Sequence, residues 1–148
     1  MKWLSRNAPS IEACSALVTA SVAIAALIGV KVQLDETERL QKAQSAREAF
    51  RAHLALAATL PQFARPKDSC ALVASTQGGS YIAFVDHLLY SAEQMLVVGE
   101  GWDATFLIEL APHKGYLCSE PAPIGATDET ASLLNDFRQN NCTDQPAC

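Results

Sequence analysis

The sequence predicts an all-α fold, with an N-terminal transmembrane helix that continues into a helical stalk and then into a small helical bundle. Residues 13–30 form a run of eighteen residues without a charge. Between Ser10 and Leu60 there is no proline and a single glycine, so nothing in that stretch interrupts a helix. Farther on, apolar residues recur at helical spacing in residues 80–98.

These observations divide the chain into five parts. We expect a flank over residues 1–9, a transmembrane helix over 10–34, a stalk helix over 35–60, a small acidic helical domain over 61–141 and a polar tail over 142–148. About 110 residues outside the membrane are enough for one small domain.

The uncharged run has nearly the length that a membrane span requires. Eighteen helical residues extend roughly 27 Å, against a hydrocarbon core of about 30 Å. Residues 32–34 extend the run if the ammonium group of Lys31 reaches the lipid headgroups. Ser10 is a good N-cap, and the negative charge of Glu12 suits a first helical turn.

Two alternatives to an uncleaved anchor remain open, a cleaved signal peptide and a buried helix of a soluble protein. Lys2 and Arg6 resemble the basic start of a signal peptide, and residues 23–25 resemble its cleavage site. However, the apolar run continues for five residues past Ala25, and Glu12 lies inside such a leader. We therefore favour the anchor.

The stalk reads as a moderately amphipathic helix. Asp35 precedes Arg39 by four residues and Glu38 precedes Lys42 by four, the favourable acid-first order. One apolar side is predicted from residues at helical spacing, namely Leu40, Ala43, Phe50, Leu54 and Ala57. Pro61 is expected to end the helix at Leu60.

The domain is expected to contain a connector over residues 61–79 with one short helical turn, followed by three helices. Ser80 is predicted to cap the first, which buries Tyr81, Ile82, Val85, Leu88, Leu89, Ala92, Met95 and Leu96 and exposes Asp86, His87, Tyr90, Glu93 and Gln94. Gly99 and Gly101 end it, and Pro112 stops or kinks the second. Thr127 is predicted to cap the last helix.

Charge is distributed unevenly along the chain. Residues 32–67 hold six basic and four acidic side chains, a balance of +2, which anionic lipids would attract weakly. Residues 68–148 hold eleven acidic and two basic side chains, a balance of −9. Such a surface repels phosphate backbones, so we exclude nucleic acid as a partner.

Four of the five cysteines lie in the outer domain and are disulfide candidates: Cys70, Cys118, Cys142 and Cys148. Free buried thiols in a cytosolic domain are the alternative. Four cysteines allow three connectivities, and we favour Cys70 with Cys118 and Cys142 with Cys148. Cys14 lies in the anchor, where a cysteine behaves as a small apolar residue.

No recognised catalytic motif occurs, and we expect a non-enzymatic protein without cofactor or metal. No glutamate has a histidine three residues later, and no nucleotide-binding, hydrolase or zinc motif appears. The alternative is a thiol site at Cys70 or Cys118, with His87 or His113 as base and Asp86 as orienting group. We favour structural roles for these residues instead. We expect His87 to be a solvated surface residue, His53 to lie at the edge of the core, and Trp102 and Tyr116 to pack in the core.

The anchor carries a strip of small residues. Ser21, Ala25 and Gly29 are spaced four apart, and Ala16 with Ala20 makes a second pair. Such strips let helices approach closely in lipid. We therefore predict a helix-packing surface that binds a protein partner or a second copy of the chain.

The order of the segments resembles a group of uncharacterised small bacterial single-pass membrane proteins with a helical soluble domain. The anchor is followed by "QSAREAFRAHL", "YIAFVDHLLYSAEQML" and "GWDATFLIELAPHKGYLC". The resemblance covers most of the chain and implies the same architecture; it implies no chemistry.

The function predicted from the sequence is that of an accessory or assembly subunit of a membrane protein complex. A membrane-tethered sensor or ligand-binding domain is the alternative, and a thiol or metal enzyme comes third. We expect the protein in the cell (inner) membrane with its amino terminus inside. Basic residues flank both ends of the anchor almost equally, so the four outer cysteines place the domain outside; the cytoplasmic side is the alternative.

Overall fold

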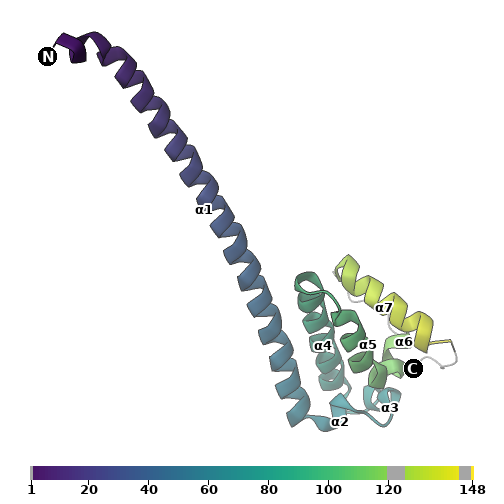
Figure 1. The fold of residues 1–148 in the computed structure, drawn as a ribbon. Helices are drawn as coiled ribbons and strands as arrows, with labels where there is room; N and C mark the ends of the chain where they lie inside the picture. Colours follow the sequence, from purple (N-terminus) through teal and green to yellow (C-terminus); the bar gives the residue numbers. More distant parts are fainter. Residues whose placement is uncertain (1, 120–125, 144–147) are drawn as a thin grey trace. The chain divides into compact units, whose positions relative to one another are not determined.

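The computed structural model describes the backbone of residues 2–119, 126–143 and 148, and within these the side chains from Ser15 onward. All elements in the described residues are helices (Figure 1). They fall into two units, Met1–Leu40 and Gln41–Cys148, and each is described by itself.

The first unit consists, in its described part, of helix α1, which spans Lys2–Thr59 and so continues into the second unit. The predicted continuity of the helix from the apolar run into residues 35–59 is confirmed. The helix begins well before Ser10, which lies inside it instead of capping it. Its end is as predicted, because Pro61 excludes helical geometry at Leu60 and starts α2, Pro61–Ala64.

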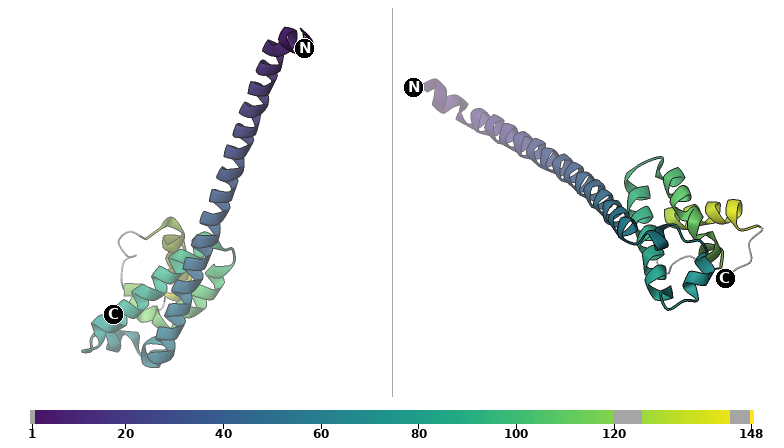
Figure 2. Two further views of the ribbon diagram at one scale, coloured as in Figure 1. Left: turned by 90° about the vertical axis from the view of Figure 1, so that its left-hand side faces the viewer. Right: turned by 90° about the horizontal axis from the view of Figure 1, so that it is seen from below.

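The second unit has a core made by α4, Gly78–Val98, α5, Trp102–Leu110, and α7, Asp128–Asn141. These three helices pack in mutual contact (Figures 1 and 2). The predicted apolar face of α4 is confirmed, since Tyr81, Val85, Leu88, Leu89, Ala92 and Met95 are buried and Ile82 and Leu96 are partly buried. Phe106 of α5 and Phe137 of α7 complete this core.

The predicted helix signals after α4 are confirmed. Gly99 and Gly101 separate α4 from α5, and Gly101 has φ 80°, a conformation that glycine adopts without strain. Pro112 lies in the 3₁₀ helix η1, Ala111–His113, which leads into α6, Lys114–Ser119. Thr127 caps α7 by accepting a hydrogen bond from the backbone N–H of Thr130.

Two local predictions were wrong in the segment before α4. The connector contains α3, Ser69–Val73, besides α2, and α3 is capped by the Asp68 side chain. Helix α4 begins at Gly78, with Gln77 at the N-cap, so Ser80 does not cap it. A Cβ atom at Gly78 would collide with the Val73 carbonyl oxygen, so this turn requires glycine.

The predicted apolar side of the stalk is confirmed at Ala43, Phe50 and Ala57, which are partly buried, and wrong at Leu40 and Leu54, which are exposed. Ala46 and His53 are buried and Phe50 is partly buried, whereas Leu54 is 46% exposed. The buried residues follow a 46–50–53 spacing, which is equally compatible with a helix. The contact is made by Ala46 and by the rings of Phe50 and His53, and of these three the prediction included only Phe50.

Candidate functional site

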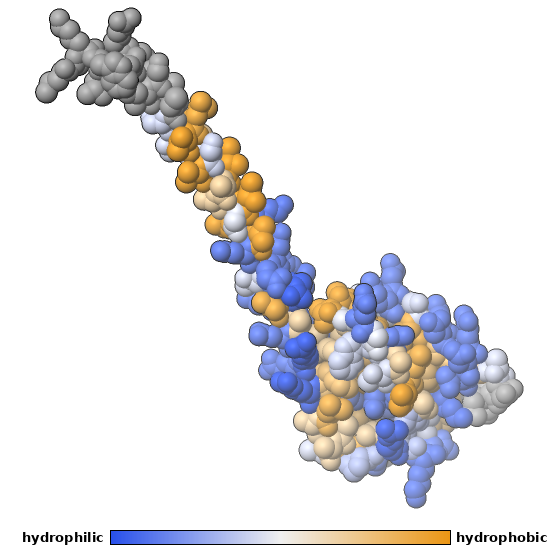
Figure 3. Space-filling model, in the orientation of Figure 1, coloured by the Kyte–Doolittle hydropathy of each residue, from blue (hydrophilic) through white to orange (hydrophobic). Residues whose placement is uncertain are grey.

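The apolar segment of α1 is a candidate lipid-contact surface. Its large side chains are exposed; Leu17 and Leu27, for example, are 69% and 70% exposed. The segment has a mean hydropathy of 2.0 and none of it is buried by the described protein. Figure 3 shows these side chains as an orange band along the helix, followed by blue polar side chains. By length and composition alone this helix is weak evidence of a membrane span, and a signal sequence passes the same test.

The small-residue strip Ser21, Ala25 and Gly29 lies on this exposed segment. A Cβ atom added at Gly29 would meet nothing within 4 Å. The Ser21 hydroxyl donates to the Leu17 carbonyl at 2.8 Å, so the one polar group of the strip is satisfied within the helix. The strip therefore presents a surface without protruding side chains or unsatisfied donors, and its use as a contact surface stays a prediction.

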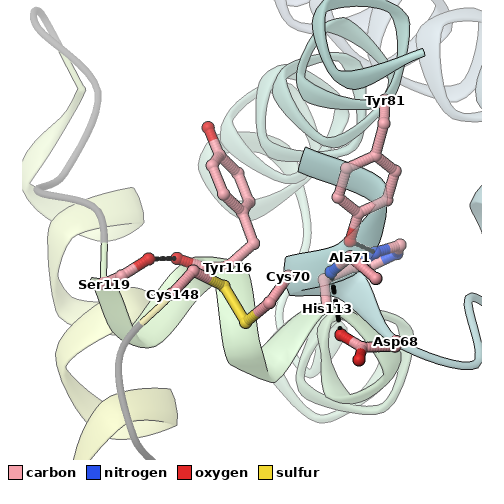
Figure 4. Close-up of a disulfide and its surroundings, with 8 residues drawn as sticks. All are labelled: Asp68, Cys70, Ala71, Tyr81, His113, Tyr116, Ser119 and Cys148. Carbon is pink, nitrogen blue, oxygen red and sulfur yellow. Dashed lines mark hydrogen bonds between the residues drawn. A yellow bond between two sulfur atoms is a disulfide. The ribbon is translucent and has the colours of Figure 1, made fainter. Parts of the chain in front are cut away.

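The four outer cysteines form two disulfide bridges, but our predicted pairing was wrong. Cys70 is bonded to Cys148 and Cys118 to Cys142. Gly115 explains the first bridge, because a Cβ atom there would lie 2.6 Å from Ser69 Oγ and 2.9 Å from Cys70 Sγ. Helix α6 thus passes directly over the start of α3, close to the Cys70–Cys148 bridge (Figure 4).

The second bridge follows from the packing of α6 against α7. Cys142 is the C-cap residue of α7, and Arg138 one turn earlier donates to the Leu117 carbonyl at 3.0 Å. Cys118 is therefore brought to the end of α7. Two bridges are typical of a domain that folds in an oxidising, non-cytoplasmic compartment.

Because Cys70 and Cys118 are both oxidised, neither supplies a thiolate in this structure. Within the described residues, no three histidine, cysteine, aspartate or glutamate side chains are placed to bind one metal ion.

An acidic groove of about 460 Å³ lies between α4, α5 and α7. Its apolar lining is Leu96, Leu107 and Leu133, and its polar lining is Asp103, Asp128, Glu129, Ser132 and Asp136. A groove with this lining can accommodate a cationic group that carries apolar surface. We did not predict this groove from the sequence, although the 128–132–136 spacing puts polar residues on one face of α7.

The three histidines lie close together among α1, α4 and η1: His53 and His113 pack against the Phe84 ring, and His87 stacks on His53. His53 is 3% exposed, with its ring centroid 4.8 Å from that of Phe84, and His113 is 1% exposed, at 6.0 Å. The predicted surface role of His87 was wrong, since His87 is partly buried and its ring lies 5.6 Å from that of His53. No pattern along the chain predicts this grouping, which arises only from tertiary packing.

Two of these histidines have pKa values well below the ordinary value. Burial, aided by the charge of His87, lowers the pKa of His53 to about 4. Burial lowers the pKa of His113 to about 4 as well, aided by His53 and Arg65. The Nδ1 atom of His113 lies 2.8 Å from the Tyr81 hydroxyl (Figure 4), whose own pKa is raised by burial. Both buried histidines are therefore neutral at pH 7.

The fold and these sites define a disulfide-bonded, all-helical domain joined to a long apolar helix. No protein-family model, no curated protein and no solved structure matches this chain.

Proposed function

We propose that the protein is a single-pass membrane protein of the cell (inner) membrane that acts without catalysis, as an accessory or assembly subunit of a membrane protein complex. The exposed apolar segment of α1 carries the proposal. Burying one large aliphatic side chain is worth about 1.5–3 kcal/mol, and residues 17–34 expose nine of them, namely Leu17, Val18, Val22, Ile24, Leu27, Ile28, Val30, Val32 and Leu34. Such a surface is stable in lipid or against another apolar helix.

The disulfides support an outward orientation of the domain, with the amino terminus inside. Periplasmic or extracellular oxidation allows both bridges to form and persist, whereas cytosolic reductants keep thiols reduced. The small-residue strip supports association within the membrane, through another protein's helix or a second copy of the chain.

A membrane-tethered ligand-binding domain is the second candidate function, and the acidic groove is the observation that favours it. Four carboxylates around three leucines would select a cationic, partly apolar ligand. Native electrophoresis of the extracted protein distinguishes the two functions: a sharp high-mass complex supports the subunit, and a lone monomer or dimer supports the ligand-binding domain.

We expect the full-length chain, with the mass that starts at Met1, to stay in the membrane pellet after carbonate extraction. Thiol labelling of intact cells with an impermeant reagent should modify the outer cysteines only after reduction, because all four are bridged and outside. A soluble product that begins near Ala26 would overturn the anchor. Four thiols that react in the cytosol without reductant would overturn the orientation.

The strip predicts a direct effect on assembly. Ala25→Leu or Gly29→Leu should weaken association in the membrane, because each adds bulk where helices must approach closely. The matched control is Ala23→Leu, on the opposite face of the helix at 100° per residue. Native electrophoresis should show loss of the large species in the two strip variants and its retention in the control. Equal retention in all three variants would remove the strip as a contact surface.

A further inference from the structure

The distal part of α1, residues 41–59, is joined to the domain by side-chain packing. The Phe50 ring lies 5.5 Å from that of Trp102 and 5.4 Å from that of Phe106, and the His53 ring packs against Phe84. Neither disulfide includes a residue of this segment, since the bridges join positions 70, 118, 142 and 148.

We call the contact of residues 41–59 with α4 and α5 the joint. Few hydrogen bonds cross it in the described residues. The Ser91 hydroxyl donates to the His87 carbonyl within α4 at 2.8 Å and reaches the Ala49 carbonyl of α1 only at 3.3 Å. His53 is the buried titratable member of the joint, and its Nδ1 atom has no hydrogen-bond partner there. The Nδ1 atom of His87 is likewise buried without a partner. The joint therefore depends on an uncharged imidazole.

In the described residues no carboxylate makes a hydrogen bond or an ion pair with His53. Helix α4 contributes His87 and the exposed Asp86, and η1 contributes His113. After α2, Arg65 lies 3.9 Å from Glu109 of α5, so that carboxylate already faces a cation. On α1 itself, Glu48 and Arg51 are exposed. The nearest titratable neighbours of His53 are thus other histidines.

We propose that His53, packed against Phe84 and His87 of α4, forms an acid-sensitive joint: protonation of His53 in mildly acidic conditions releases residues 41–59 of α1 from α4, while the disulfide-bonded helices stay folded. A buried imidazolium is unfavourable when the N–H at its Nδ1 atom has no acceptor, as at His53. Cation–π attraction to the Phe84 ring offsets part of this cost.

The direction of the pH effect follows from the histidine in the two states. The released His53 has its ordinary pKa of 6.5, and the packed one a pKa of about 4. The contact is therefore at full strength above pH 6.5 and weakens as the pH falls from 6.5 toward 4. At pH 5 the packed state should lose a factor of about 30 in its equilibrium constant from His53 alone.

Hydrogen exchange of the full chain in detergent, at pH 7.5 and pH 5, tests the proposal. After correction for intrinsic exchange, protection of amides in residues 46–59 should fall at least tenfold at pH 5, and that of α7 should fall much less. An equal fall in both segments would indicate global unfolding and overturn the proposal. Unchanged protection of residues 46–59 would overturn it as well.

Two variants remove the imidazole of His53 in different ways. If one of them fails to fold, the other can still be measured. His53→Gln keeps a polar side chain, and His53→Leu replaces it by an apolar one. In either variant the pH response of residues 46–59 should largely disappear. The matched control His113→Gln, which alters the other buried histidine, should retain it. A full acid response in a folded His53 variant would contradict the assignment.

Discussion

Replacing both Cys70 and Cys148 by serine should lower the free energy of unfolding of the domain by about 4 kcal/mol. The bridge closes a loop of 78 residues, and the loss of chain entropy in the unfolded state grows with loop length. Small domains are stable by about 5–15 kcal/mol, so this loss removes a large share of the total. Denaturant unfolding of the full chain in detergent, followed by circular dichroism at the far-ultraviolet helix bands, measures it.

The second bridge provides the matched comparison. Cys118→Ser with Cys142→Ser opens a loop of 24 residues and should cost about 3 kcal/mol, less than the first pair. Cys14→Ser, which alters neither bridge, should leave the unfolding midpoint of the domain in place. A smaller loss for the Cys70–Cys148 pair than for the Cys118–Cys142 pair would show that native-state effects outweigh loop entropy at these sites.

Phe106→Ala should destabilise the domain by about 3–5 kcal/mol, the usual cost of truncating a fully buried phenylalanine. Its side chain has no exposed surface, and its ring packs against Phe50 of α1 and Trp102 of α5. The cavity would therefore weaken both the core and the attachment of residues 41–59.

The control for this substitution lies on the same helix. Ile108→Ala alters a side chain that is 63% exposed and should change the free energy of unfolding by less than about 0.5 kcal/mol. Equilibrium unfolding of the two variants beside the unaltered chain gives both values. Similar losses in the two would contradict the burial of Phe106 in the core.

Element ends were predictable where one residue decides them locally. Pro61 ends α1, the two glycines separate α4 from α5, and Thr127 caps α7 through its own side chain. The wrong cap at Ser80 has a different cause. The turn before α4 is set by the close approach of Gly78 to Val73, and no local pattern reports that approach.

The candidate sites were less predictable because they join distant residues. The apolar segment and its small-residue strip are visible in the sequence, since both depend on spacing within one helix. The pairing of Cys70 with Cys148 depends instead on how α6 crosses α3, and the exposure of His87 depends on the rotation of α1 about its axis. The predicted side of α1 included Phe50 but not Ala46 or His53, whose burial depends on tertiary contacts with the domain.

The Cys118–Cys142 bridge lies inside the loop that the Cys70–Cys148 bridge closes, and this arrangement has a consequence for biogenesis. If the domain is exported from its amino-terminal side, as proposed, Cys70 emerges first and Cys118 is the first thiol that can react with it. Oxidation during emergence would then trap Cys70–Cys118, a pairing that the folded domain does not contain. Native pairing therefore requires either that oxidation waits until Cys148 has emerged or that a thiol–disulfide exchange catalyst rearranges the early bridge. The yield of this protein should accordingly depend on the isomerase capacity of the compartment as well as on its oxidising power.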